Sequence, residues 1–285
     1  MSDIRFGTAG LSESFKAQKG KAMKDMPEYT ASFGLNAFEY QCGHGVRLAA
    51  DTAEILRKKG EQLGIVFSLH APYYISMSSM EEEKRLNSVT YILKSAQAVR
   101  MLGGRRVIFH SGSCGKQTRE EALQKAKATL AAMLHSLDEE GYEDIVICPE
   151  TMGKIGQLGT LQEVLELCKT DKRVVPCIDF GHLNARTQGG VAALSDYEDI
   201  LNAMEDALQD DRARCFHAHF SKIEYSAGGE KRHLTFADTQ YGPQYQPLLE
   251  LCYKRNLSPT IICESAGTQA EDAQTMLAYW QGLNR

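Results

Sequence analysis

Hydrophobic residues follow two spacings that alternate along the chain. Short runs of apolar, β-branched and aromatic residues are typical of strands, whereas longer stretches with apolar residues three or four apart are typical of helices. The short runs predict eight strands, at residues 4–11, 37–42, 65–70, 106–110, 144–148, 174–179, 214–219 and 260–264. The longer stretches predict helices at residues 48–63, 80–102, 119–140, 161–168, 196–208, 247–254 and 271–280. Thr118, directly before Arg-Glu-Glu, is the expected N-cap of the third helix.

Strands that alternate with helices are typical of α/β folds with a parallel sheet. Eight repeats in 285 residues give about 36 residues per repeat, the size expected for the units of a (β/α)8 TIM barrel. The alternative is a doubly wound open sheet, whose first strand normally runs into a GxGxxG phosphate loop. Residues 7–11, Gly-Thr-Ala-Gly-Leu, lack that form. We therefore expect one α/β domain over residues 1–285, a TIM barrel with its active site at the C-terminal ends of the strands.

Composition and charge limit the cellular compartments and the binding partners that we expect for the protein. The chain is 43% hydrophobic and 24% charged, with a net charge of −5, and no apolar run approaches the roughly 18–20 residues that cross a membrane. The first residues lack the pattern of a secretory signal, and the eight cysteines form no CxxC pair. We expect a cytoplasmic monomer with reduced thiols and no membrane partner. Because the chain is acidic, any contact with DNA would depend on a local patch.

Histidines and carboxylates gather where the predicted strands end. Six of the eight histidines lie at or just after such an end. In a barrel these ends meet at one mouth, and neutral imidazoles mixed with carboxylates are ligands of zinc and related divalent metals. The candidates are His70, His110, Glu150, Asp179, His182, His217, His219, His233 and Glu264. The sequence predicts a metal centre, and carboxylates on different strands allow a pair of ions of the kind that hydrolyses phosphate esters.

Three cysteines, Cys148, Cys177 and Cys215, each precede one of these candidates by two residues. Because side chains alternate along a strand, each cysteine is expected to face the barrel interior about 6.6 Å below its neighbouring candidate. That depth favours a role in core packing over metal ligation.

Five short motifs occur at the predicted strand ends. They are His-Ala-Pro-Tyr at residues 70–73, Phe-His-Ser-Gly-Ser at 109–113, Pro-Glu-Thr-Met-Gly-Lys at 149–154, Ile-Asp-Phe-Gly-His at 178–182 and Cys-Glu-Ser at 263–265. With them the chain closely resembles, over essentially its whole length, the endonuclease IV family of abasic-site DNA repair enzymes, which are xylose isomerase-like barrels. The resemblance implies base excision repair: cleavage of the phosphodiester 5′ to an abasic site in double-stranded DNA, leaving a 3′-hydroxyl.

The resemblance also implies a trinuclear zinc site. By matching motifs, the ligands are His70, His110 and Glu150 for the first metal, Glu150, Asp179, His217 and Glu264 for the second, and His182 and His233 for the third. The carboxylates Glu150, Asp179 and Glu264 would serve catalysis, in which a metal-bridging hydroxide attacks phosphorus while the ions neutralise the phosphate. Two to three Zn²⁺ ions per chain are expected, with Mn²⁺ as an alternative that the same ligands accept.

The third metal site departs from the family pattern. The family has Asp two residues before the last histidine, and here that position is Lys231. The nearest acid is Glu230, three residues before His233, and it is the expected replacement. His219, which shares a strand face with His217, is a second candidate. Without either residue, the third site would be weak or absent, and residues 41–47 match the family too poorly to carry over DNA contacts.

Residues that contact DNA are expected around the mouth. Tyr73 matches an aromatic residue that enters the DNA beside the lesion in the family, where a wedge can stack in place of the missing base. Basic residues just beyond the strand ends are expected to form a phosphate-binding rim. They are Lys154, Arg186, Lys222, Lys231 and Arg232.

Two other functions remain open at this point. A sugar isomerase or epimerase of the same superfamily needs one divalent ion, for which Glu150, Asp179, His217 and Glu264 suffice. The other is a DNA-binding protein that has the same fold but catalyses no reaction. The additional histidines favour the nuclease, because a single-metal enzyme does not need them as ligands.

Overall fold

Eight parallel strands form the centre of the computed structural model, which describes residues 4–283. They are β1 (Arg5–Ala9), β2 (Ala37–Gln41), β3 (Val66–His70), β4 (Arg106–Phe109), β5 (Val146–Pro149), β6 (Cys177–Asp179), β7 (His217–Phe220) and β10 (Thr260–Cys263). Their order is β5-β4-β3-β2-β1-β10-β7-β6, and parallel bridges from Ile147 to Val174 and from Glu150 to Cys177 join the two ends. The sheet therefore closes into a barrel, which confirms the predicted TIM-barrel fold.

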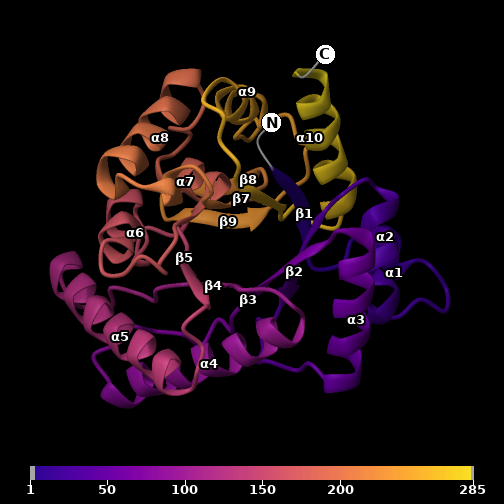
Figure 1. The fold of residues 1–285 in the computed structure, drawn as a ribbon. Coiled ribbons are helices and arrows are strands. Elements are labelled where there is room, and N and C mark those ends of the chain that lie inside the picture. The colour runs from indigo at the N-terminus through magenta and orange to yellow at the C-terminus, as the bar shows by residue number, and fades with distance from the viewer. Residues whose placement is uncertain (1–3, 284–285) are drawn as a thin grey trace.

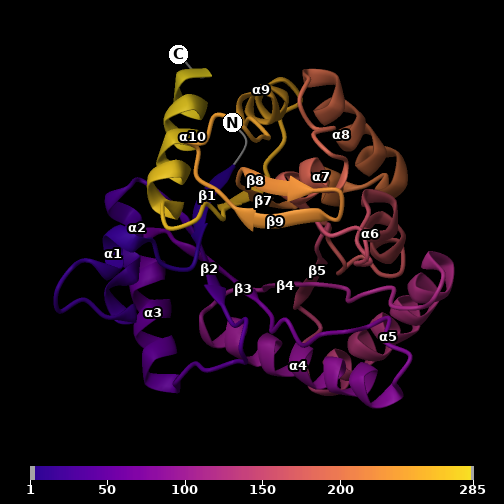
Figure 2. The ribbon, with the colours of Figure 1, turned by 180° about the vertical axis from the view of Figure 1, so that it is seen from behind.

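Helices surround this barrel on its outside (Figures 1 and 2). The seven predicted helices are α3 (Ala50–Leu63), α4 (Glu82–Met101), α5 (Arg119–Glu139), α6 (Leu161–Cys168), α8 (Leu194–Leu208), α9 (Gln246–Lys254) and α10 (Gln269–Leu283). Thr118 caps α5 as expected, because its hydroxyl accepts from the Glu121 backbone N–H while the Glu121 carboxylate accepts from the Thr118 N–H. Within residues 4–283, no helix is long and apolar enough to span a membrane.

Within residues 4–283, three α-helices, two short 3₁₀ helices (Met23–Asp25 and Asp211–Ala213) and one hairpin were not predicted. The α-helices are α1 (Glu13–Lys16), α2 (Met26–Ser32) and α7 (Phe180–Arg186). The hairpin is antiparallel and consists of β8 (Ile223–Ser226) and β9 (Gly229–His233). It lies beside α7 near the end of β7 (Figures 1 and 2). Its anchor is the loop after β5, where the Glu230 backbone N–H donates to the Gly153 carbonyl and the Ile155 N–H donates to the Gly228 carbonyl.

The barrel interior below the mouth is apolar on one side. Cys148 and Cys177 are buried there with Ile108 and Val175, as the packing prediction expects, but Cys177 Sγ also lies within 4.8 Å of ring nitrogens of His217 and His219. The same prediction is wrong for Cys215, which is partly exposed and lies before β7 begins. A short 3₁₀ turn at Asp211–Ala213 continues into this segment, so the Cys215 N–H and thiol both donate to the Asp211 carbonyl instead of entering the sheet.

Candidate metal centre at the barrel mouth

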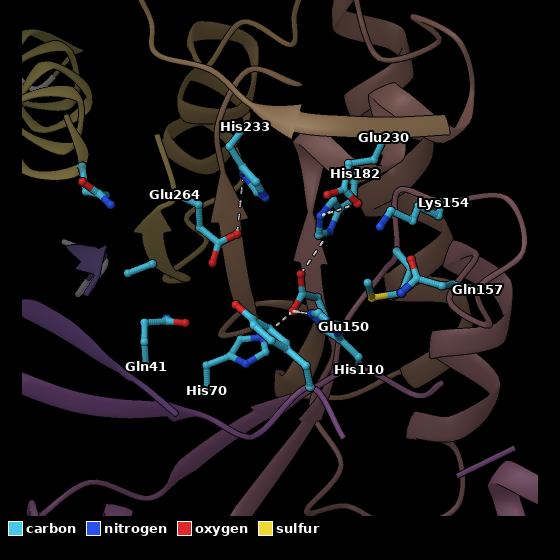
Figure 3. A pocket seen from close by; sticks show the side chains of 14 residues that line it. Gln41, His70, His110, Glu150, Lys154, Gln157, His182, Glu230, His233 and Glu264 are labelled. Carbon is cyan, nitrogen blue, oxygen red and sulfur yellow. Dashed lines mark hydrogen bonds and ion pairs between the residues drawn. The ribbon is translucent and has the colours of Figure 1, made fainter. Parts of the chain in front are cut away.

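Most of the histidines and carboxylates predicted to bind metal converge on one open cavity of about 530 Å³ at the C-terminal ends of the strands (Figure 3). Strand ends supply His70, His110, Glu150, Asp179, His219 and Glu264, α7 supplies His182, and the hairpin strand β9 supplies Glu230 and His233. These residues form three groups, in each of which the ligand atoms lie within 4.8 Å of one another, and residues 4–283 contain one further group of this kind, Cys177, His217 and His219. Parallel strands bring them together because their carboxyl ends meet at one rim.

The first group consists of His70, His110 and Glu150. Glu150 Oε2 lies 3.1 Å from His70 Nε2 and 3.4 Å from His110 Nε2. His70 Nδ1 is 2.9 Å from the Ala71 carbonyl and donates to it, so Nε2 is the nitrogen that faces the cavity. Burial lowers the pKa of His110 even though Glu150 opposes the shift. A neutral imidazole of this kind is the form that binds metals.

The second group consists of Glu150, Asp179, His219 and Glu264. His219 Nδ1 lies 3.4 Å from Glu150 Oε1 and 3.5 Å from Glu264 Oε1. Burial raises the pKa of Glu264, and the charges of Glu150 and Asp179 raise it further. Asp179 Oδ2 and both ring nitrogens of His219 are buried and have no hydrogen-bond partner among residues 4–283. Since unpaired buried polar atoms are costly, a divalent cation among these oxygens and His219 Nδ1 fits the group.

The third group consists of His182, Glu230 and His233. His182 Nε2 lies 3.3 Å from Glu230 Oε2, and the His182 and His233 rings are 5.6 Å apart. His182 Nδ1 is 2.9 Å from the Thr151 carbonyl, and His233 Nδ1 is 2.8 Å from the Ser221 hydroxyl. Glu230 thus supplies the carboxylate of this group, as expected for the replacement of the family's Asp. The ammonium group of Lys231, which occupies the position of that Asp in the sequence, pairs with Glu224 on the hairpin instead.

The two histidines of β7 do not lie where the motif predicts. The structure places His219, and not His217, beside Glu150, Asp179 and Glu264. His217 lies deeper, where its Nε2 donates to Glu39 Oε2 at 2.9 Å and burial lowers its pKa to about 4. Both side chains face inward because they are two residues apart, which separates them by about 6.6 Å along the strand. In the sheet, Asp179 pairs with His219 and Cys177 pairs with His217, so the register between strands, which the motif does not contain, decides which histidine lies beside Asp179.

Of the residues expected to bind substrate, Tyr73 and Lys154 line the cavity. The Tyr73 ring is stacked on the His110 ring with centroids 5.4 Å apart. The structure places Arg186, Lys222 and Arg232 elsewhere. Their donors are already used: Arg186 binds the carbonyls of the loop after β5, the buried Lys222 ammonium binds the Phe236 and Asp238 carbonyls, and Arg232 pairs with Glu224 at 2.7 Å. These three side chains hold loops and the hairpin in place.

Gly153 has no side chain, and this allows Glu230 and His182 of the third group to approach the backbone at this position closely. A Cβ at this position would lie 2.6 Å from Glu230 Cβ and 2.9 Å from His182 Cδ2, so Gly153→Ala must push the two ligands apart. We expect this variant to bind one divalent ion fewer per chain than the wild type, as measured by elemental analysis of dialysed protein. Gly156→Ala in the same loop is the control, because its Cβ would meet no described atom within 4 Å. Equal metal content in Gly153→Ala and the wild type would show that the third group holds no ion.

Comparisons with known proteins show which family and which relatives the sequence of this chain resembles. Residues 27–281 match the family model described as a xylose isomerase-like TIM barrel. An uncharacterized protein of Methanocaldococcus jannaschii is 33% identical over 274 residues, which are 96% of each chain. A probable endonuclease 4 of Acholeplasma laidlawii is 28% identical over 204 residues, which are 70% of this chain and 66% of that relative.

Solved structures share the fold at low sequence identity. A D-tagatose 3-epimerase-like protein superposes with a TM-score of 0.74, and endonuclease IV from Thermus thermophilus with a TM-score of 0.69. Each is 20% identical to this chain, and each comparison covers 98% of both chains. An epimerase-like protein and an endonuclease therefore both occur among the structural neighbours of this barrel.

Proposed function

This chain belongs to the xylose isomerase-like TIM-barrel family, and we propose that it is a metal-dependent endonuclease, which hydrolyses the phosphodiester 5′ to an abasic site in double-stranded DNA. The observation that carries the proposal is the surplus of ligand groups. Glu150, Asp179, His219 and Glu264 would suffice for one ion, yet His70 and His110 form a further group around the same Glu150. The His182 group adds a third set of ligands at the same mouth.

The chain's own residues assemble the site as follows. Glu150 is shared between the first two groups, with one oxygen toward His70 and His110 and the other toward His219. His219 takes the place that the sequence motif assigns to His217. When bound, divalent ions, for which we expect Zn²⁺ with Mn²⁺ as the alternative, supply charge neutralisation of the phosphodiester and a lowered pKa for the attacking water. Asp179 and Glu264 would complete the set of carboxylates that holds these ions.

The substrate side of the site is aromatic rather than strongly basic. Tyr73 lies between the main cavity and a second cavity formed by residues around 40–47, and it lines both. Its ring comes so close to Gly43 that a Cβ there would lie 2.5 Å from Tyr73 Cε2. Tyr73 is nevertheless 54% exposed. An exposed ring held over the opening is suited to stack where a base is missing from the duplex.

Replacing Tyr73 by Ala should lower the preference for abasic duplex over intact duplex by about tenfold, because one base-sized stacking contact contributes about 1–3 kcal/mol. Binding of both duplexes by fluorescence anisotropy measures this, and the metal content should stay at the wild-type value. Tyr74→Ala is the matched control, since Tyr74 is also 54% exposed but does not line the main cavity. Loss of metal in Tyr73→Ala would instead assign Tyr73 a structural role.

We place the protein in the cytoplasm as a monomer. The eight cysteines are free in the structure, in keeping with a reducing compartment.

An incision assay tests the proposed activity directly. The protein, loaded with Zn²⁺, should cut a labelled duplex once, 5′ to a stable abasic analogue, leave a 3′-hydroxyl and spare the undamaged duplex. Binding of the abasic duplex without cutting would favour a DNA-binding protein without turnover. A preparation that does not cut but interconverts ketohexoses would favour the single-metal sugar epimerase, for which Glu150, Asp179, His219 and Glu264 provide a sufficient ligand set. Either outcome would overturn the endonuclease.

A further inference from the structure

A fully buried carboxylate lies directly below the second ligand group. Glu39, on β2, is 0% exposed and faces the barrel interior. Its Oε2 accepts from Ser68 Oγ at 3.0 Å and from His217 Nε2 at 2.9 Å. Its Oε1 accepts from Gln41 Nε2 at 3.2 Å and lies 3.0 Å from His219 Nε2. Neither the motifs nor the strand-end pattern of the sequence marks this residue.

Burying a charge at this depth is costly unless it is fully compensated. Each oxygen of Glu39 faces two nitrogen or hydroxyl groups, so Glu39 remains ionised in the barrel interior. The structure therefore places a carboxylate with four polar contacts immediately beneath the candidate metal centre.

His219 is oriented differently from His70. His70 directs Nδ1 to the backbone carbonyl of Ala71, which is a neutral acceptor. His219 instead turns Nδ1 toward Glu150 and Glu264 and turns Nε2 toward the Glu39 carboxylate.

The ligand role of His219 requires one particular tautomer. A nitrogen that binds a cation must carry a lone pair, so binding through Nδ1 places the ring proton on Nε2. That proton is buried, and Glu39 Oε1 lies 3.0 Å from Nε2 as an ion-pair contact, while Nε2 makes no hydrogen bond within residues 4–283. A carboxylate behind a histidine ligand both fixes the ring and makes the ligating nitrogen more basic.

We propose that Glu39 is a positioning residue that holds His219 with its Nδ1 lone pair directed at the cation position shared with Glu150, Asp179 and Glu264. The inference rests on the proposed function only in requiring that a divalent ion binds there. His217 then has a distinct role as the second imidazole donor to Glu39, which fixes the carboxylate in place. This role explains why a histidine that matches a ligand motif lies one layer below the ligands.

Histidine-selective ¹⁵N NMR of the Zn²⁺-loaded wild type tests the tautomer without any substitution. The expected spectrum has the His219 proton on Nε2 and the metal-bound resonance on Nδ1. A proton on Nδ1, or no change at His219 when Zn²⁺ is added, would overturn the proposal.

Zn²⁺ affinity, measured by competition with a chromophoric chelator, tests the energetic consequence. Glu39→Gln keeps the size of the side chain but removes its charge, and it should weaken the tightest Zn²⁺ site that involves His219 by about 10–100-fold. Glu39→Asp, which restores the charge, should recover part of this loss. Ser68→Ala is the control, because it removes one donor to Glu39 Oε2 and leaves the contact with His219, and its affinity should stay close to that of the wild type.

Unchanged Zn²⁺ affinity in a folded Glu39→Gln variant would overturn the proposal, and so would a loss that Glu39→Asp does not reduce at all. None of these measurements uses DNA. A protein that fails to cut abasic duplex can still show the predicted tautomer and affinities, and a protein that cuts it can still lack them. The failure of this inference is therefore distinguishable from the failure of the proposed function.

Discussion

Replacing Glu150 by Gln should reduce incision of abasic duplex by about 10³-fold or more, the largest effect expected for any single substitution in this protein. Glu150 is the one carboxylate common to two ligand groups: Oε2 lies 3.1 Å from His70 Nε2, and Oε1 lies 3.4 Å from His219 Nδ1. Gln keeps the shape but offers a neutral oxygen and an NH₂ group that repels a cation. Weakening two ions together removes several kcal/mol of transition-state stabilisation, and each 1.4 kcal/mol is about tenfold in rate.

Single-turnover rates on abasic duplex measure this effect, together with the metal content of the same preparation. Glu166→Gln is the matched control: this carboxylate lies on α6, pairs with Lys127 and Lys169 at the surface, and takes no part in the mouth. Its rate should equal that of the wild type, because such surface pairs contribute little. Undiminished cutting by Glu150→Gln would contradict the shared-ligand role of Glu150.

Removing divalent ions with a chelator should lower the melting temperature by about 10 °C and abolish incision. The site holds Glu150, Asp179 and Glu264 close to one another, and burial, with a further contribution from the charges of Glu150 and Asp179, raises the pKa of Glu264. An ion at 1,000 times its dissociation constant stabilises the folded chain by about 4 kcal/mol, and about 2–4 °C is expected per kcal/mol in a chain of this size. Thermal unfolding followed by circular dichroism, with and without chelator, measures the shift.

Adding Zn²⁺ back should restore both the melting temperature and incision. Glu150→Gln provides the control for specificity, since its melting temperature should respond much less to the chelator. Identical unfolding curves for the wild type with and without chelator would contradict metal binding at this mouth.

The barrel could be predicted from the sequence because each strand carries a distinct apolar run and each intervening helix shows helical spacing. The β8–β9 hairpin could not, because its strands are short and polar: β9 reads Gly-Glu-Lys-Arg-His, and only Gly229 within it is buried. Helix α7 was missed for a different reason. It starts directly after β6, and Asp179 Oδ1 caps it by accepting from the His182 N–H at 2.7 Å. A candidate metal ligand therefore also serves as a helix cap.

The residues of the candidate site were predicted unevenly, for physical reasons. A histidine or carboxylate at a strand end reaches the mouth whatever its neighbours, so His70, His110 and Glu150 were identifiable from position alone. The choice between His217 and His219 depends on register with β6, which the sequence of one strand does not contain.

Contacts made across the fold were still harder to predict. Arg186 and Lys222 follow strand ends, as a phosphate-binding rim requires, but their donors meet backbone carbonyls of distant loops. Glu39 lies in the middle of a strand. Only the closed barrel brings it beneath His219.

Counting the divalent ions bound per chain tests the central claim most directly. Native mass spectrometry of Zn²⁺-loaded protein should show at least two ions on the wild type, with fewer on His70→Ala and His110→Ala. A single ion on the wild type, retained unchanged by both variants, would contradict the account and identify Glu150, Asp179, His219 and Glu264 as an isolated one-metal site.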